Sequence, residues 1–190
     1  MALYTLSDTH LSFQTAKPMD IFGARWQDHA EKIQKNWRSL ITPEDTVIVP
    51  GDITWAMTTV EAVEDFAFLD SLPGHKIICG TRGWYNDGVS PKECDYQKIV
   101  AREGGRLTRS LQAGKALEEG ELIAFLHFPP VFGDFVCRPL LDILHAFDVK
   151  RVYFGHIHGV YNLPSHFDYE SIRFTIVSAD YLNFVPLRVF

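Results

Sequence analysis

A short apolar run that ends in a carboxylate constrains the fold of this chain most. Residues 46–49 read Thr-Val-Ile-Val, and Pro50-Gly51 stops the run directly before Asp52. A run of apolar and β-branched residues bounded by proline and glycine is typical of a short buried strand. Because ligands of α/β proteins gather outside the carboxyl ends of strands, Asp52 is expected at a functional edge of a sheet.

Three further strand-like runs end in the same way. They span residues 3–7, 122–126 and 151–154; the first two are followed directly by Asp8 and His127, and the third by Gly155 and then His156. The residues in these positions are Asp8, His10, His127, His156 and His158. Since parallel strands present their carboxyl ends at one edge, we expect these side chains to be candidates for a shared site.

Apolar residues at helical spacing separate the strands. We predict helices over residues 26–40, 58–69 and 138–147, and a further helix that a capping box opens at Ser90. Gly104-Gly105 interrupts that last pattern, and each glycine costs about 1 kcal/mol relative to alanine, so a helix break is expected there. Further strands are predicted over 75–79 and 172–177.

Alternating strands and helices indicate an α/β layered fold. The sequence contains no internal repeat, charge block or low-complexity linker, so we expect one domain over residues 1–190. A chain of 190 residues with 46% hydrophobic composition is long and apolar enough for a sizeable core.

Composition also limits the binding partners and the cellular compartment that we expect for the protein. The formal net charge of −6 and the lack of a lysine and arginine block argue against nucleic-acid binding. No apolar run approaches the roughly 18 residues of a membrane span, and no secretory leader precedes the first strand. Three cysteines without C-x-x-C spacing suggest free thiols rather than disulfides or a thiolate zinc site. We therefore expect a cytoplasmic protein that does not act at membranes.

The candidate residues have the chemistry of metal ligands. In Gly155-His-Ile-His-Gly159 the glycines permit a tight turn, which brings two imidazoles near one centre. Taken singly, the others have simpler explanations: Asp8 and His10 can shape a turn, Asp52 can cap the next segment, and His127 can be a core histidine. Six nitrogen and oxygen donors exceed one closed tetrahedral site, so we expect two divalent ions, manganese, iron or zinc, with Asp52 as the bridging ligand.

These residues also carry a family resemblance. Asp8-x-His10, Gly51-Asp52, His127 and Gly155-His-x-His158 resemble, in order and spacing, the motifs of the calcineurin-like metallophosphoesterases, in particular a bacterial cytoplasmic branch. The segment Ser178-Ala-Asp-Tyr-Leu-Asn183 also resembles the sequence of that branch. The resemblance implies a β-sandwich flanked by helices. It also implies that Asp8, His10 and His158 hold one metal, that His127 and His156 hold the second, and that Asp52 bridges them.

One motif of that family is missing. The family carries Gly-Asn-His-Asp/Glu after its third strand, whereas here residues 76–78 continue as Cys79-Gly-Thr-Arg-Gly-Trp84. We infer an internal deletion near Ile78 and Cys79. Arg82, which now follows that strand, either holds phosphate through its guanidinium or is an exposed loop residue. Loss of a strand would expose a sheet edge, so self-association is also expected.

The expected function is therefore hydrolysis of phosphate mono- or diesters by water activated at a dinuclear metal site, with Asp52 and Arg82 as catalytic candidates. The alternative is a metal-binding protein of the same fold whose catalysis is impaired, because the missing motif supplies a ligand and a phosphate-contacting histidine in the family. The substrate would be a phosphorylated compound that the sequence does not identify.

Overall fold

The computed structural model describes residues 1–78, 82–83, 93–117 and 120–190. The chain forms two compact units, which are described separately. The first comprises Met1–Cys79, Ile157–Tyr161 and Val177–Phe190, and the second comprises Gly80–His156 and Asn162–Ile176. The single domain expected over residues 1–190 stays a prediction.

The first unit is built on a four-stranded sheet in the order β10-β1-β2-β3. Strands β1 (Leu3–Thr5), β2 (Thr46–Val49) and β3 (His75–Ile78) are parallel, and β10 (Leu187–Arg188) is antiparallel to β1. The strand predicted at 46–49 is confirmed, and the one predicted at 75–79 is confirmed over 75–78. The strand predicted at 3–7 is shorter than expected and ends at Thr5, after which Ser7 forms an isolated bridge with Ser178. Asp8 and Asp52 follow neighbouring parallel strands, so they emerge at the same edge.

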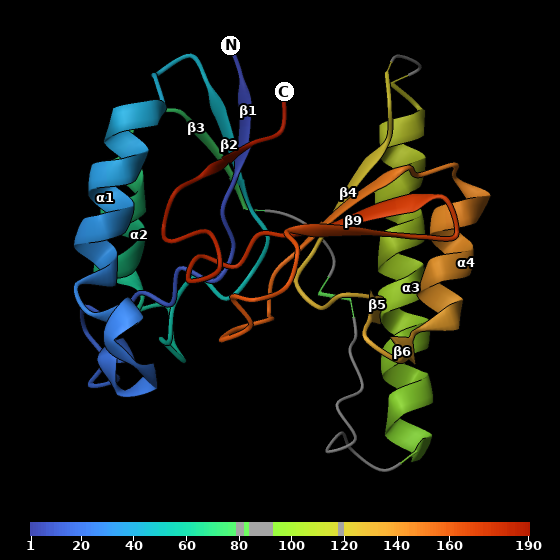
Figure 1. Ribbon diagram of the computed structural model, residues 1–190, viewed down its shortest axis with the longest axis horizontal. Helices are drawn as coiled ribbons and strands as arrows, with labels where there is room; N and C mark the ends of the chain where they lie inside the picture. Colours follow the sequence, from blue (N-terminus) through green and yellow to red (C-terminus); the bar gives the residue numbers. More distant parts are fainter. Residues whose placement is uncertain (79–81, 84–92, 118–119) are drawn as a thin grey trace. The chain divides into compact units, whose positions relative to one another are not determined.

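Two helices lie beside this sheet, α1 (His29–Leu40) and α2 (Val63–Asp70) (Figure 1). Ile33 and Trp37 of α1 and Leu69 of α2 join one core with residues of β1 and β2. Helix α1 begins three residues later than predicted, because Trp26 closes the 3-10 helix η2 (Ala24–Trp26), which follows η1 (Met19–Phe22).

Helix α2 also begins later than its capping box predicts. The Thr58 hydroxyl accepts a hydrogen bond from the Glu61 backbone N–H at 3.3 Å, and the Glu61 carboxylate accepts one from the Met57 N–H at 3.0 Å. These bonds stabilise a turn ahead of the helix, and the helix proper starts at Val63.

The second unit holds another four-stranded sheet, in the order β4-β7-β9-β8. Strands β4 (Ile123–Leu126), β7 (Arg151–Phe154) and β9 (Ile172–Ile176) are parallel, while β8 (His166–Tyr169) is antiparallel. A small hairpin joins β5 (Val131–Phe132) to β6 (Phe135–Val136). The predicted strands at 122–126, 151–154 and 172–177 are present, and both units together give a mixed α/β fold.

Helices α3 (Glu93–Lys115) and α4 (Arg138–Ala146) run side by side in this unit (Figure 1). The predicted break at Gly104-Gly105 is wrong, because α3 continues through both glycines. A Cβ on Gly104 would lie 3.1 Å from Ile143 Cδ1 of α4, so the missing side chain permits close packing of the two helices. The start of the Ser90 capping box lies outside the described residues.

None of the helices in the described ranges combines the length and the apolar character needed to cross a bilayer.

Gly104 and Gly105 of α3 should respond oppositely to substitution. A Cβ on Gly105 meets only Arg109 Nη1 at 3.6 Å, so Gly105→Ala should raise the free energy of unfolding by about 0.4–1 kcal/mol through unfolded-state entropy. Gly104→Leu overpacks the contact with α4 and should lower it by about 1–3 kcal/mol. Urea denaturation of both variants measures this, and equal effects would contradict the packing role of Gly104.

The position of β3 makes self-association testable. Among the described residues, β3 pairs with β2 alone, and Ile77 on it is 45% exposed. We predict dimers or larger species on size-exclusion chromatography with light scattering, reduced by Ile77→Lys because charge disfavours strand pairing at an edge. Val63→Lys, at an exposed site on α2, is the control. A monodisperse monomer would refute the prediction.

Candidate metal centre

The segments that follow β1 and β2 are hydrogen-bonded to each other beyond the ends of the strands. The Asp8 N–H donates to the Gly51 carbonyl at 3.2 Å, and the His10 N–H donates to the Asp52 carbonyl at 3.0 Å. Thr9 adds a side-chain bond from its hydroxyl to the Ile53 carbonyl at 2.8 Å. These bonds fix the backbone from which three predicted ligands project.

That backbone adopts an unusual conformation. Asp8, His10 and Asp52 have φ angles of +57°, +43° and +40°, in the left-handed region that residues with a Cβ rarely occupy. Such a residue costs on the order of 1–3 kcal/mol and persists where its surroundings hold it. In the second unit His156 shares this feature, with φ of +69°. Six other described non-glycine residues also have positive φ, so the strain at four predicted ligands agrees with a functional site but does not identify one by itself.

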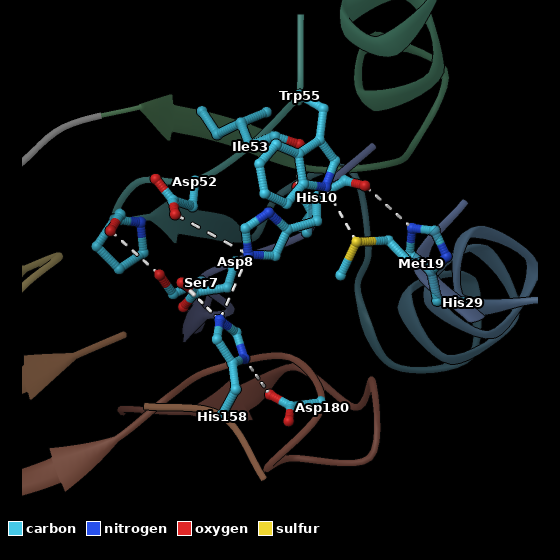
Figure 2. A network of polar contacts seen from close by, with 12 residues as sticks. Ser7, Asp8, His10, Met19, His29, Asp52, Ile53, Trp55, His158 and Asp180 are labelled. Atoms are coloured by element: carbon cyan, nitrogen blue, oxygen red, sulfur yellow. Dashed lines mark hydrogen bonds and ion pairs between the residues drawn. The ribbon is translucent and has the colours of Figure 1, made fainter. Parts of the chain in front are cut away.

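Three donor groups converge in the first unit. His10 Nε2 lies 3.4 Å from His158 Nε2, and His158 Nε2 lies 3.5 Å from Asp8 Oδ1 (Figure 2). One ligand atom from each of these residues lies within 4.8 Å of the others. Asp8, His10 and His158 are the residues expected to hold one metal ion, and the structure brings them together.

The donor set suits a divalent cation. Asp8 is fully buried and His10 is 6% exposed, and a buried carboxylate is costly unless a cation or hydrogen bonds compensate it. Imidazole nitrogen with carboxylate oxygen is a combination that zinc, manganese and iron accept. Asp52 Oδ2 lies 3.9 Å from His10 Nε2 with its side chain 48% exposed, so Asp52 stands at the solvent side of the group.

Asp180 is a further residue of this site, and it was not among the predicted ligands. Its Oδ1 lies 2.7 Å from His158 Nδ1, while its Oδ2 accepts hydrogen bonds from the Gly159 N–H and the Tyr161 hydroxyl. The available signal was its place shortly after the strand that ends at Ile176, inside the motif Ser178–Asn183.

These contacts shift the pKa values of both partners. Burial lowers the pKa of His158, but hydrogen bonds and charges from Asp180 and Asp8 outweigh it and raise the pKa to about 10. Burial raises the pKa of the Asp180 carboxyl, whereas the hydrogen bond and charge of His158 prevail and lower it. Without a metal ion, a proton on His158 therefore supplies positive charge beside the two carboxylates.

Aromatic rings surround the imidazoles. Trp55 stacks on His10 with ring centroids 5.0 Å apart, and Trp26 packs edge-on against His10 at 5.7 Å and against His158 at 5.6 Å. His29, whose pKa burial lowers, has its Nε2 3.3 Å from the His10 carbonyl. Packing against these aromatic rings limits the movement of the His10 and His158 imidazoles.

The remaining candidates lie in the second unit. His127 follows β4 and His156 follows β7, and their ring centroids are 5.3 Å apart. The Arg82 guanidinium lies 5.0 Å from the ring centroid of Phe128, and the Arg82 carbonyl accepts a hydrogen bond from the Phe128 N–H. Convergence of all six predicted ligands on one centre stays a prediction.

Comparisons with known proteins show the fold and no function. The chain is similar to the crystal structure of AQ665, a protein of unknown function from Aquifex aeolicus, with 16% identity and a TM-score of 0.54. The match covers 98% of this chain and 95% of that chain. No protein-family model and no curated protein matches the sequence. The likeness supports a general α/β class.

Metal binding should depend on the three converging residues. We predict that Mn²⁺ quenches tryptophan fluorescence, because Trp26 and Trp55 flank His10. Asp8→Asn and His10→Ala should each weaken this binding by at least about tenfold, the scale of even an indirect ligand perturbation. His75→Ala, at an exposed position of β3, is the control. Unchanged titrations for both ligand variants would remove the basis for this metal centre.

Proposed function

We propose that the protein is a metal-dependent phosphoesterase that hydrolyses phosphate mono- or diesters. The observation that carries the proposal is the convergence of Asp8, His10 and His158, of which Asp8 and His10 are buried and have positive φ angles. Strained residues are maintained where the surrounding fold fixes them, and they cluster at active sites. The calcineurin-like fold, shortened near Ile78 and Cys79, and a cytoplasmic location are parts of the same proposal.

We assign a role to each of the six predicted ligands. Asp8, His10 and His158 would hold one divalent ion, His127 and His156 would hold a second, and Asp52 is the expected bridging ligand. Bound divalent ions supply positive charge to phosphoryl oxygens and lower the pKa of water. Manganese, iron and zinc all accept this donor set.

Asp52 and Arg82 are the residues best suited to act near the substrate. The Asp52 side chain is 48% exposed, whereas Asp8 is fully buried, so Asp52 is the carboxylate that solvent and substrate can approach. Arg82 is also exposed, and a guanidinium binds phosphate with two parallel hydrogen bonds. We assign Arg82 the task of orienting the phosphoryl group.

A second candidate function is metal binding with impaired catalysis. The absence of a Gly-Asn-His-Asp/Glu motif from the sequence favours it, because that motif supplies the family with a histidine for the leaving group. Loss of a general acid lowers rates by roughly 10²–10⁴-fold. Both functions share the metal site and differ in turnover.

Activity on a generic substrate separates these functions. With Mn²⁺ present, the protein should hydrolyse bis-p-nitrophenyl phosphate or p-nitrophenyl phosphate, and Asp52→Asn should lower kcat by at least about tenfold. Replacement of the exposed His75 by glutamine should leave kcat unchanged. If Mn²⁺ binds but turnover of the wild-type protein equals that of Asp52→Asn, the impaired form is correct and the enzyme proposal fails.

A further inference from the structure

We propose that Asp180 is a positioning residue, which fixes the orientation and the tautomer of His158 so that Nε2 is presented to the metal ion. This inference rests on the metal site of the proposed function. Asp180 contacts His158 directly, and it acts on the metal ion through that ring.

The geometry fixes which nitrogen of His158 carries hydrogen. Asp180 is fully buried, and its Oδ1 lies 2.7 Å from His158 Nδ1. An ionised carboxylate only accepts hydrogen bonds, so Nδ1 must be the donor. In neutral His158 the lone pair is then on Nε2, the nitrogen that lies 3.5 Å from Asp8 Oδ1 and faces His10 (Figure 2).

Asp180 is itself held from several directions. Its Oδ2 accepts hydrogen bonds from the Tyr161 hydroxyl at 2.9 Å and the Gly159 N–H at 3.1 Å. Arg25 covers the Tyr161 ring, with the guanidinium carbon 3.9 Å from the ring centroid, and donates to the Asp180 carbonyl at 3.1 Å. Rotation of the carboxylate would break the bonds from Tyr161 and Gly159, and the Arg25 bond holds the Asp180 backbone, so together they restrict the direction of the His158 ring.

Such a carboxylate gives a metal-ligating histidine both a defined tautomer and greater basicity. Loss of a partner of this kind lowers metal affinity by about 10–100-fold. Gly159, which follows His158, has a φ angle of +75°, and its N–H donates to the same Asp180 carboxylate.

A double-mutant cycle read by Mn²⁺ affinity tests the proposal. In the wild-type background, Asp180→Asn should weaken Mn²⁺ binding by about 10–100-fold. In a His158→Ala background the same change should have an effect of less than about twofold, because the residue through which Asp180 acts is gone. Asp45→Asn, which alters a buried carboxylate bonded to Ala2 and Thr42, controls for general destabilisation. Equal losses in both backgrounds would overturn the positioning role.

A second measurement uses the wild-type protein and does not depend on the folding of a variant. Long-range ¹H–¹⁵N NMR spectra of the Zn²⁺-loaded protein, assigned with His158→Gln, should show hydrogen on Nδ1 and a metallated Nε2. Hydrogen on Nε2, or failure of the wild-type protein to bind either ion, would refute the inference. Coupling and the Nδ1–H tautomer without phosphoester turnover would leave it intact and refute the proposed function instead.

Discussion

Backbone pairing beyond the ends of β1 and β2 is the interaction on which the site depends. Bonds such as those from the His10 N–H to the Asp52 carbonyl, and from the Leu11 N–H to the Ile53 carbonyl, continue the contact between the two segments after the strands stop. Each contributes about 0.5–1.5 kcal/mol, which offsets strain at the positive-φ residues. The donor groups are therefore directed by the fold itself, before any ion binds.

Buried charge is the second constraint. Asp8 and Asp180 are both fully buried, and His158 stands between them, in contact with Asp180 through Nδ1 and with Asp8 through Nε2. Two buried carboxylates require compensation by hydrogen bonds or by positive charge. A proton on His158 or a cation beside Nε2 satisfies that requirement, so the electrostatics that stabilise the metal-free fold are the same ones that favour metal binding.

The sequence was informative where local chemistry decides the structure. Apolar β-branched runs such as 46–49 predicted strands, and their ends located Asp8, His10 and Asp52. It was misleading at Gly104, because the packing of α4 against α3 overrides helix propensity and is invisible in a local window. Asp180 was missed for a related reason: its role depends on His158, which lies 22 residues earlier in the chain. The two-residue strand β10 carries no pattern to detect.

Under the proposed function, the number and exposure of the described donors suit a reactive site better than a purely structural one. Structural zinc sites are closed by four protein ligands, whereas catalytic sites keep a position open. Here three residues form the close group, and exposure of the side chains increases from Asp8 at 0%, through His158 at 32%, to Asp52 at 48%. Under that proposal Asp8, His10 and His158 would hold the ion, and Asp52, the most exposed of these donors, would be the carboxylate that a substrate can approach.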